Sequence, residues 1–298
     1  MEHLGLAKYA LGIRISQGDT SISLIQDTYI SSILTKFNVD QVKPTPSSLP
    51  SNYKQFKIIN KKSCCQPPFN YRRAVGLLQY LVQCTQPDLS FAVSFLSQFL
   101  QSPQEPHYSA IIHILKYLSG TRQYSLKLAR NLLNHHEKEI LGFSDSGWGE
   151  GSKNKSFSSF LVYFLGVLDW RARKQKVVAL SSAEAKYNAL IESSQDLPWT
   201  KQLILETTNL QVQCTLYSDN LSAIAIASNP VYHHGTQHIN FRLHFIRYAL
   251  KKQSLKLKYL PTSKMLANML TKNLPLVKYL PQLKMILSNP ELTSTVEY

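Results

Sequence analysis

The sequence predicts an α/β fold in which a mixed five-stranded sheet with flanking helices follows a β-hairpin and a small helical segment. Three observations support this fold class. Residues 9–26 alternate between apolar and polar side chains around the turn Gln17-Gly18-Asp19-Thr20, which is typical of a hairpin. Residues 71–120 carry apolar side chains at helical spacing. After residue 139, apolar runs of strand length alternate with helical patterns.

Residues 1–39 are interpreted as the hairpin followed by one short helix. Apolar residues recur three and four positions apart between Tyr29 and Phe37, so this stretch predicts a helix with one buried stripe. Residues 40–70 lose this periodicity and are rich in proline. Proline without periodicity is typical of irregular chain, so we expect a linker or surface loop there.

Residues 71–128 predict three helices joined by short loops. Pro87 can open the second helix, Pro103 separates it from the third, and Gly120 is placed to end the third. Short connections between helices are typical of a small bundle. The polar stretch 129–138 that follows marks the expected boundary between two domains.

Residues 139–275 predict the second domain, and residues 276–298 are expected to be a C-terminal tail. Short loops favour antiparallel pairing of the first three strands, whereas helices between the later strands favour parallel pairing. Pro198 is expected to separate two helices, at 183–191 and 199–207. The three tryptophans adjoin apolar segments and are expected in the core. The expected strands are 140–144, 157–165, 167–180, 214–218 and 255–260.

The charge balance favours a polyanionic partner. The chain has 33 Lys and Arg against 18 Asp and Glu, a formal net charge of +15, and both halves are basic. Such an excess suits nucleic acid, because each phosphate contact releases counterions, although a merely soluble basic protein is the alternative on charge alone. No apolar run approaches the ~18 residues of a membrane span, and the start lacks the features of a secretory signal. We therefore expect no membrane partner, no secretion, and a location in the cytoplasm or nucleus.

Three acidic residues lie at the ends of predicted elements. Asp145 follows the first strand of the second domain, Glu184 lies in the first turn of its first long helix, and Asp219 follows the fourth strand. Strand ends and helix starts share the ligand-binding edge of an open α/β sheet, and carboxylates that converge there suit a hard cation such as Mg²⁺. The alternative is structural, because Ser181 with Glu184 fits a capping box and Asp219-Asn220 can cap the next helix.

Five stretches around these acids form a recognisable set, namely Gly142–Trp148, Gln175–Ala185, Tyr217–Ile224, His238–Asn240 and Leu266–Lys272. In content, order and spacing they resemble the ribonuclease H domain of copia-type LTR retrotransposon polyproteins. Five blocks in order are far more specific than a single short motif. Further stretches resemble the end of the reverse transcriptase palm and its thumb and connection region: Leu4-Gly5, Tyr9–Ile13, Tyr71–Gly76, Gln86–Ser90 and Leu115–Thr121.

The resemblance implies a ribonuclease H-like sheet that hydrolyses RNA in RNA–DNA hybrids with two Mg²⁺ or Mn²⁺ ions. Asp145, Glu184 and Asp219 match three of the catalytic metal ligands, and Asn268 stands at the position of the fourth. An asparagine oxygen can ligate Mg²⁺ but brings no charge, so we expect weaker binding of one ion. Lys186 stands where the family commonly has Glu. The alternative function is a catalytically impaired remnant that binds nucleic acid.

The resemblance also sets the expected partners. The chain contains no Asp-Asp pair, which the polymerase palm of the family carries, so no polymerase activity is expected from this chain alone. We expect it to act as part of a truncated reverse transcriptase, with an RNA–DNA hybrid and the rest of the polyprotein as partners. The side chains expected to contact nucleic acid are Arg72, Arg73, Lys116, Arg122, Arg171, Arg173, Lys176 and Asn220.

Overall fold

The chain forms two compact units, each with its own sheet. The computed structural model describes all residues except 1–4, 58–66, 131–138, 229–239, 253 and 290–298. The first unit comprises Met1–Asn131 and Asn273–Tyr298, and the second comprises Leu132–Lys272. His238 and Ile239 of the matched sequence blocks lie outside the described residues. In the described part of the chain, no helix combines the length and the apolar character of a membrane span.

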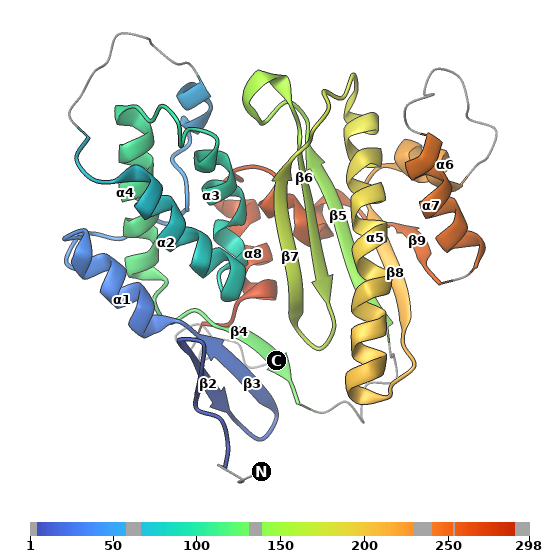
Figure 1. The fold of residues 1–298 in the computed structure, drawn as a ribbon, viewed down its shortest axis with the longest axis horizontal. Coiled ribbons are helices and arrows are strands. Elements are labelled where there is room, and N and C mark those ends of the chain that lie inside the picture. Colours follow the sequence, from blue (N-terminus) through green and yellow to red (C-terminus); the bar gives the residue numbers. More distant parts are fainter. Residues whose placement is uncertain (1–4, 58–66, 131–138, 229–239, 253, 290–298) are drawn as a thin grey trace. The chain divides into compact units, whose positions relative to one another are not determined.

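The sheet of the first unit is antiparallel and has the order β1-β2-β3-β4 (Figure 1). Its centre, β2 (Ile13–Gln17) and β3 (Ser21–Ile25), confirms the predicted hairpin. The short β1 (Tyr9–Ala10) pairs with β2, and β4 (Leu126–Ala129) pairs with β3. The end of the predicted helical segment is therefore a strand of this sheet.

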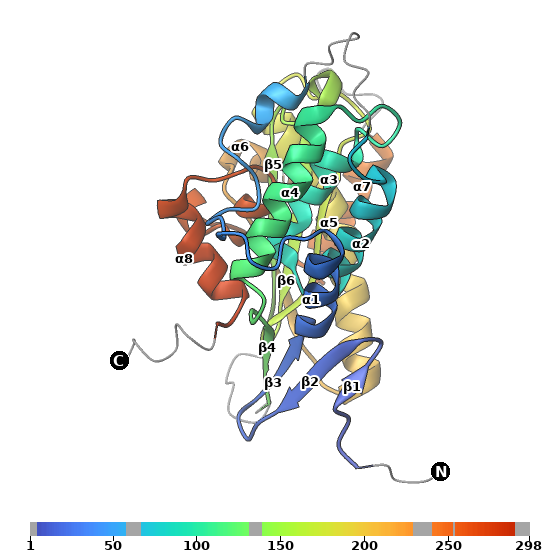
Figure 2. The same ribbon diagram turned by 90° about the vertical axis from the view of Figure 1, so that its left-hand side faces the viewer.

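The helices of the first unit include the three that the sequence predicts between residues 71 and 120. They pack against one another (Figure 2) and bury Leu78, Leu96 and Ile111. A further helix forms where the sequence predicts a tail, because Tyr279, Leu283 and Ile286 lie on one buried face. The helices are α1 (Asp27–Lys36), α2 (Tyr71–Cys84), α3 (Ser90–Ser97), α4 (Glu105–Gly120) and α8 (Leu276–Ile286).

The segment predicted as a linker contributes side chains to the core of the first unit. Leu49, Tyr53 and Phe56 are buried. The Tyr53 ring packs edge-on against Phe91 and Phe95, with ring centroids 5.7 and 5.4 Å away. These aromatic contacts anchor a stretch whose composition predicts irregular structure but not burial.

A buried hydrogen-bond network joins Asp88, Tyr117 of α4 and Tyr279 of α8. The Tyr117 hydroxyl donates to Asp88 Oδ2 at 2.6 Å and lies 3.0 Å from the Tyr279 hydroxyl. Burial raises the pKa of Asp88 to about 6, and the hydrogen bond from Tyr117 opposes part of this rise. The network therefore ties α8 to the helical segment of the same unit.

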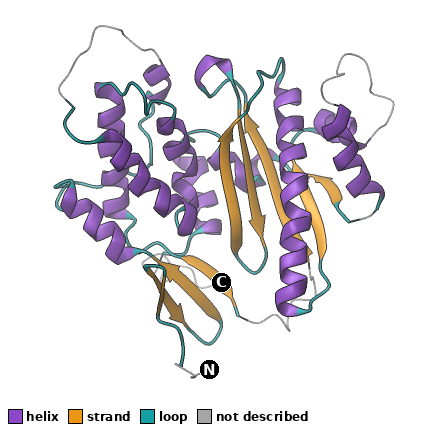
Figure 3. Cartoon of the chain, viewed as in Figure 1, coloured by secondary structure: helices purple, strands orange, loops and turns teal. Residues whose placement is uncertain are grey.

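The sheet of the second unit is mixed and has the order β7-β6-β5-β8-β9 (Figure 3). The first three strands pair antiparallel, and the last two run parallel to β5. This confirms the predicted five-stranded sheet. The third strand ends at Lys174 rather than at residue 180, because the next side chain, Gln175, turns inward and donates to Ser158 and Ala185. The strands are β5 (Glu139–Gly147), β6 (Phe157–Tyr163), β7 (Val167–Lys174), β8 (Gln213–Ser218) and β9 (Lys256–Tyr259).

One long helix, α5 (Ser182–Thr208), packs against β5, β6 and β8, and α6 (Leu221–Ser228) and α7 (Asn240–Lys251) pack against it. Pro198 lies inside α5, so the predicted break into two helices is wrong. A proline removes one backbone hydrogen bond, and packing of the helix on the sheet outweighs that loss. Contact is close at Gly142, where a Cβ would lie 2.6 Å from Leu197 Cδ1.

Candidate active site

Asp145 and Asp219 lie at the carboxyl ends of two neighbouring parallel strands. Phe143 of β5 pairs with Tyr217 of β8, so the two aspartates, each two residues further on, occupy equivalent positions. Asp145 lies within β5, which extends beyond the predicted end at Ser144. The side chains of Asp145 and Asp219 are 1% and 2% exposed. The structure thus brings these two predicted residues together at a buried edge of the sheet.

Lys186, in the second turn of α5, bridges the two aspartates. Its Nζ donates to Asp145 Oδ1 at 2.9 Å and also to Asp219 Oδ1. Burial by itself would lower the pKa of Lys186, but the two carboxylates outweigh it and the pKa is raised. The bridging group is therefore a charged ammonium at neutral pH.

The remaining carboxylate oxygens also have protein donors nearby. Thr262 Oγ1 donates to Asp219 Oδ2 at 2.7 Å, and Thr271 Oγ1 lies 3.1 Å from Asp145 Oδ2. The segment that carries Thr271 approaches β5 closely at Gly147, where a Cβ would lie 2.7 Å from the Thr271 carbonyl oxygen. Each of the four carboxylate oxygens therefore has a donor within hydrogen-bond distance.

Glu184 does not join the two aspartates. Its backbone N–H donates to Ser181 Oγ at 3.1 Å, and its Oε2 accepts from the Leu180 N–H at 2.8 Å. These bonds form the N-terminal cap of α5 that the structural alternative for Glu184 expects. Asn220 is likewise a cap, because its Oδ1 accepts from the Ala223 N–H at 2.8 Å at the start of α6.

Asn268 lies in the short 3₁₀ segment Leu266–Leu270, which packs against β5 and β6. Ser159 of β6 fixes this segment by donating to the Ala267 carbonyl at 2.7 Å. Asn268 is buried, and its Oδ1 has no hydrogen-bond partner within the described residues. A neutral amide thus lies beside the strand edge at the position where the resemblance expects a carboxylate.

These residues do not fit a site for two divalent ions. Within the residues that the structure describes, no three His, Cys, Asp or Glu side chains gather into a group that could hold a metal. Glu184 is engaged in a helix cap, Asn268 is neutral, and Lys186 brings a positive charge between the two aspartates. In the described structure Asp145, Lys186 and Asp219 form an ion-pair triad at this edge, and Glu184 lies outside it.

Sequence reasoning missed Lys186, Thr262 and Thr271 as members of this site. One signal for Lys186 was available, since it lies three and four residues before Ala189 and Leu190, both of which are buried. Residues at that spacing share one helix face. The threonines carry no comparable signal, because they lie in irregular segments.

No family model matches the chain, but individual known proteins are similar to it and indicate its family. It is 34% identical over 289 residues to the retrovirus-related Pol polyprotein from transposon TNT 1-94 of Nicotiana tabacum, an alignment that covers 94% of this chain and 21% of that protein. It is 35% identical over 279 residues to the corresponding polyprotein from transposon RE1 of Arabidopsis thaliana, covering 89% of this chain and 18% of that protein. The chain belongs to the retrovirus-related Pol polyproteins of transposons.

The chain spans about a fifth of the length of these relatives. Among solved structures, the chain is similar to LC11 ribonuclease H1 isolated from compost, with 15% identity, a TM-score of 0.36, and coverage of 45% of this chain and 93% of that chain. The N-terminal ribonuclease H domain of a Mycobacterium tuberculosis protein gives a TM-score of 0.33 over 45% of this chain.

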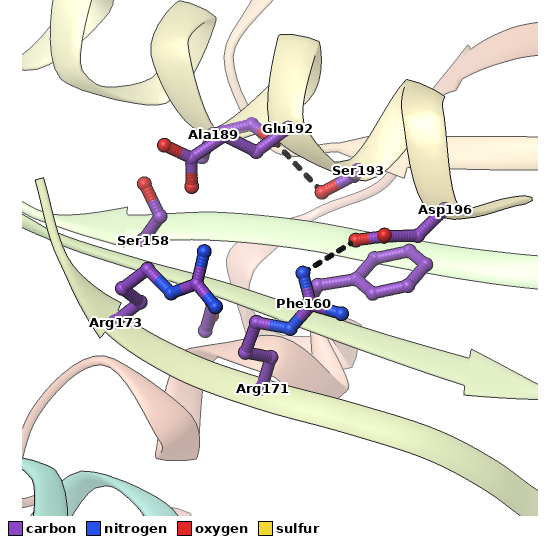
Figure 4. A pocket seen from close by; sticks show the side chains of 9 residues that line it. Ser158, Phe160, Arg171, Arg173, Ala189, Glu192, Ser193 and Asp196 are labelled. Carbon is purple, nitrogen blue, oxygen red and sulfur yellow. Dashed lines mark hydrogen bonds and ion pairs between the residues drawn. The ribbon is translucent and has the colours of Figure 1, made fainter.

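The remaining predicted nucleic-acid contacts fall into two groups. On β7, Arg171 donates to Asp196 of α5 at 3.0 Å, and both line a small pocket on the sheet face that Arg173 also borders (Figure 4). Arg173 and Lys176 are exposed, whereas Arg171 is already paired. The other group belongs to the first unit, where Arg72 and Arg73 are exposed on α2 and Lys116 and Arg122 are half-buried.

The prediction that the tryptophans lie in the core is wrong for two of the three, and the third, Trp170, is half-buried. Trp148 and Trp199 are 57% and 63% exposed. The Trp148 indole N–H donates to the Ala179 carbonyl at 3.1 Å, which ties Trp148 to the segment that carries the exposed Val177 and Leu180. An exposed aromatic ring therefore lies directly after the end of β5.

Proposed function

We propose that the second unit is a ribonuclease H-like module that binds RNA–DNA hybrids without hydrolysing them. The observation that carries this proposal is the Lys186 ammonium held between Asp145 and Asp219. Membership of the Pol polyprotein family and the mixed five-stranded sheet support the link to ribonuclease H. The site supports the loss of hydrolysis.

Hydrolysis of a phosphodiester by two metal ions depends on carboxylates that hold both ions. Asp145 and Asp219 are retained, but Lys186 neutralises part of their charge, and Asn268 adds none. A divalent ion would have to displace an ammonium and two hydroxyls from the carboxylate oxygens. We therefore expect affinity for Mg²⁺ at this edge to be very low.

Binding is supported by a cluster of three lysines, Lys153, Lys155 and Lys174. Lys155 Nζ donates to the Lys176 carbonyl. Burial and then the charges of Lys155 and Lys153 lower the pKa of Lys174, so three ammonium groups lie close enough to repel one another. Phosphates relieve such repulsion, and the exposed Trp148 ring can stack on a base.

A second candidate function is residual hydrolysis with two Mg²⁺ or Mn²⁺ ions. The retention of Asp145 and Asp219 in equivalent strand positions favours it. Residual hydrolysis requires Lys186 to leave the space between Asp145 and Asp219. Arg173 and Lys176 remain proposed contacts to nucleic acid under both candidates, as do Arg72 and Arg73 in the first unit.

We expect the purified chain to shift a labelled RNA–DNA hybrid in a gel in EDTA and in Mg²⁺ alike, and to leave the RNA strand intact. Replacement of Lys153, Lys155 and Lys174 by Gln should lower the slope of log affinity against log salt by about 2–3, at ~0.9 per lost phosphate contact. The matched control removes three charges elsewhere on the unit, at Lys201, Lys251 and Lys252, and should change the slope much less. Cleavage of the hybrid by the wild type would favour the second candidate, and absence of any shift would refute both.

A further inference from the structure

We propose that Lys186 is a built-in counter-ion, which makes the acidic edge of the second unit stable without any divalent metal. This inference concerns folding and does not depend on the proposed binding of hybrids. It rests on the contacts of three side chains, Asp145, Asp219 and Lys186, in the described structure.

The two buried aspartates require a balancing proton or cation inside the fold. They lie at equivalent positions on adjacent parallel strands and are almost fully buried. Two buried carboxylates that close repel each other, so one must be protonated or a cation must lie between them. Within the described part of the chain, Lys186 is the only cation that forms an ion pair with either aspartate.

The geometry of Lys186 provides such a cation between the two aspartates. Its side chain is only 17% exposed, and its ammonium contacts one oxygen of each aspartate. Thr262 and Thr271 lie within hydrogen-bond distance of the other two oxygens. Lys186 therefore offsets one of the two carboxylate charges, each carboxylate oxygen has a donor from the chain within hydrogen-bond distance, and a divalent ion adds nothing that folding requires.

The test compares thermal unfolding of the full chain in EDTA and in Mg²⁺. Tryptophan fluorescence reports on the second unit alone, because the chain has three tryptophans and all of them (Trp148, Trp170 and Trp199) lie in that unit. We expect the wild-type melting temperature to be the same in both buffers. Lys186→Gln should lower it by about 6–12 °C in EDTA, because a buried ion pair is broken, and Mg²⁺ should restore part of the loss.

Matched variants separate charge from packing. Lys186→Arg keeps the cation and should remain indifferent to Mg²⁺, and Lys201→Gln on the same helix should melt like the wild type. If Lys186→Gln does not fold, the neutral triple variant Lys186→Gln/Asp145→Asn/Asp219→Asn should still fold, with no response to Mg²⁺. The proposal is overturned if Mg²⁺ stabilises the wild type, if Lys186→Gln melts like the wild type in EDTA, or if the neutral triple variant also fails to fold.

Discussion

Replacing Lys186 by Glu and Asn268 by Asp in the same chain is expected to produce Mg²⁺-dependent cleavage of RNA in an RNA–DNA hybrid. The first change replaces the ammonium between Asp145 and Asp219 by a carboxylate, and the second adds a charge at the buried amide. Metal ions contribute several kcal/mol of transition-state stabilisation, so the expected gain over the wild type is at least about 10²- to 10³-fold. The measurement is single-turnover cleavage of a labelled hybrid.

The two single variants show whether Lys186 or Asn268 limits cleavage more. Asn268→Asp alone should stay inactive, because the Lys186 ammonium still occupies the space between the aspartates. Lys186→Glu alone should recover part of the activity, since three carboxylates then share the edge. Adding Asp145→Asn to the double variant should abolish cleavage and serves as the control. Strong activity of Asn268→Asp alone would show that Lys186 is no barrier.

The free energy of unfolding of the first unit is expected to decrease as the pH rises from about 4 to about 6. Burial raises the folded-state pKa of Asp88 from its ordinary value of 3.8 to about 6, so the folded state binds its proton more tightly than the unfolded state. The stabilisation is complete below the unfolded pKa and is lost as the pH rises through the folded pKa. A shift of this size corresponds to roughly 1–3 kcal/mol.

The Asp88→Asn variant should remove this pH dependence, because an amide in the network with Tyr117 does not titrate in this range. Hydrogen exchange of the α4 and α8 amides at pH 4, 5 and 6 measures the effect in the unit that contains Asp88. The matched control is Asp40→Asn in the same unit, at an exposed side chain, and its profile should follow the wild type. If the exchange of Asp88→Asn depends on pH as it does in the wild type, Asp88 is not the source of the pH dependence.

Much of the fold follows from the sequence because local patterns and packing agree. The hairpin of β2 and β3 has both alternation and turn chemistry, and the five strands of the second unit have loops whose lengths decide their pairing. The failures share one cause. Pro198 inside α5 and the buried helix α8 depend on contacts with distant residues, which local periodicity does not report.

The residues of the candidate site also divide into those that the sequence predicts and those that only the structure reveals. Asp145 and Asp219 are predictable because each belongs to a strand end, and parallel pairing then fixes their neighbourhood. Glu184 and Lys186 lie two residues apart on one helix, so only one of them can face the sheet edge. The matched block alone does not decide which, whereas the capping bonds of Glu184 in the structure do.

The central claim is that Lys186 replaces a divalent ion, and uptake of Mn²⁺ by the free protein tests it most directly. Free Mn²⁺ gives a strong paramagnetic resonance signal that disappears on binding. We predict that the wild-type chain leaves this signal unchanged at equimolar concentration, whereas the Lys186→Glu/Asn268→Asp variant depletes it. Stoichiometric uptake of Mn²⁺ by the wild type, lost on Asp145→Asn, would contradict the account.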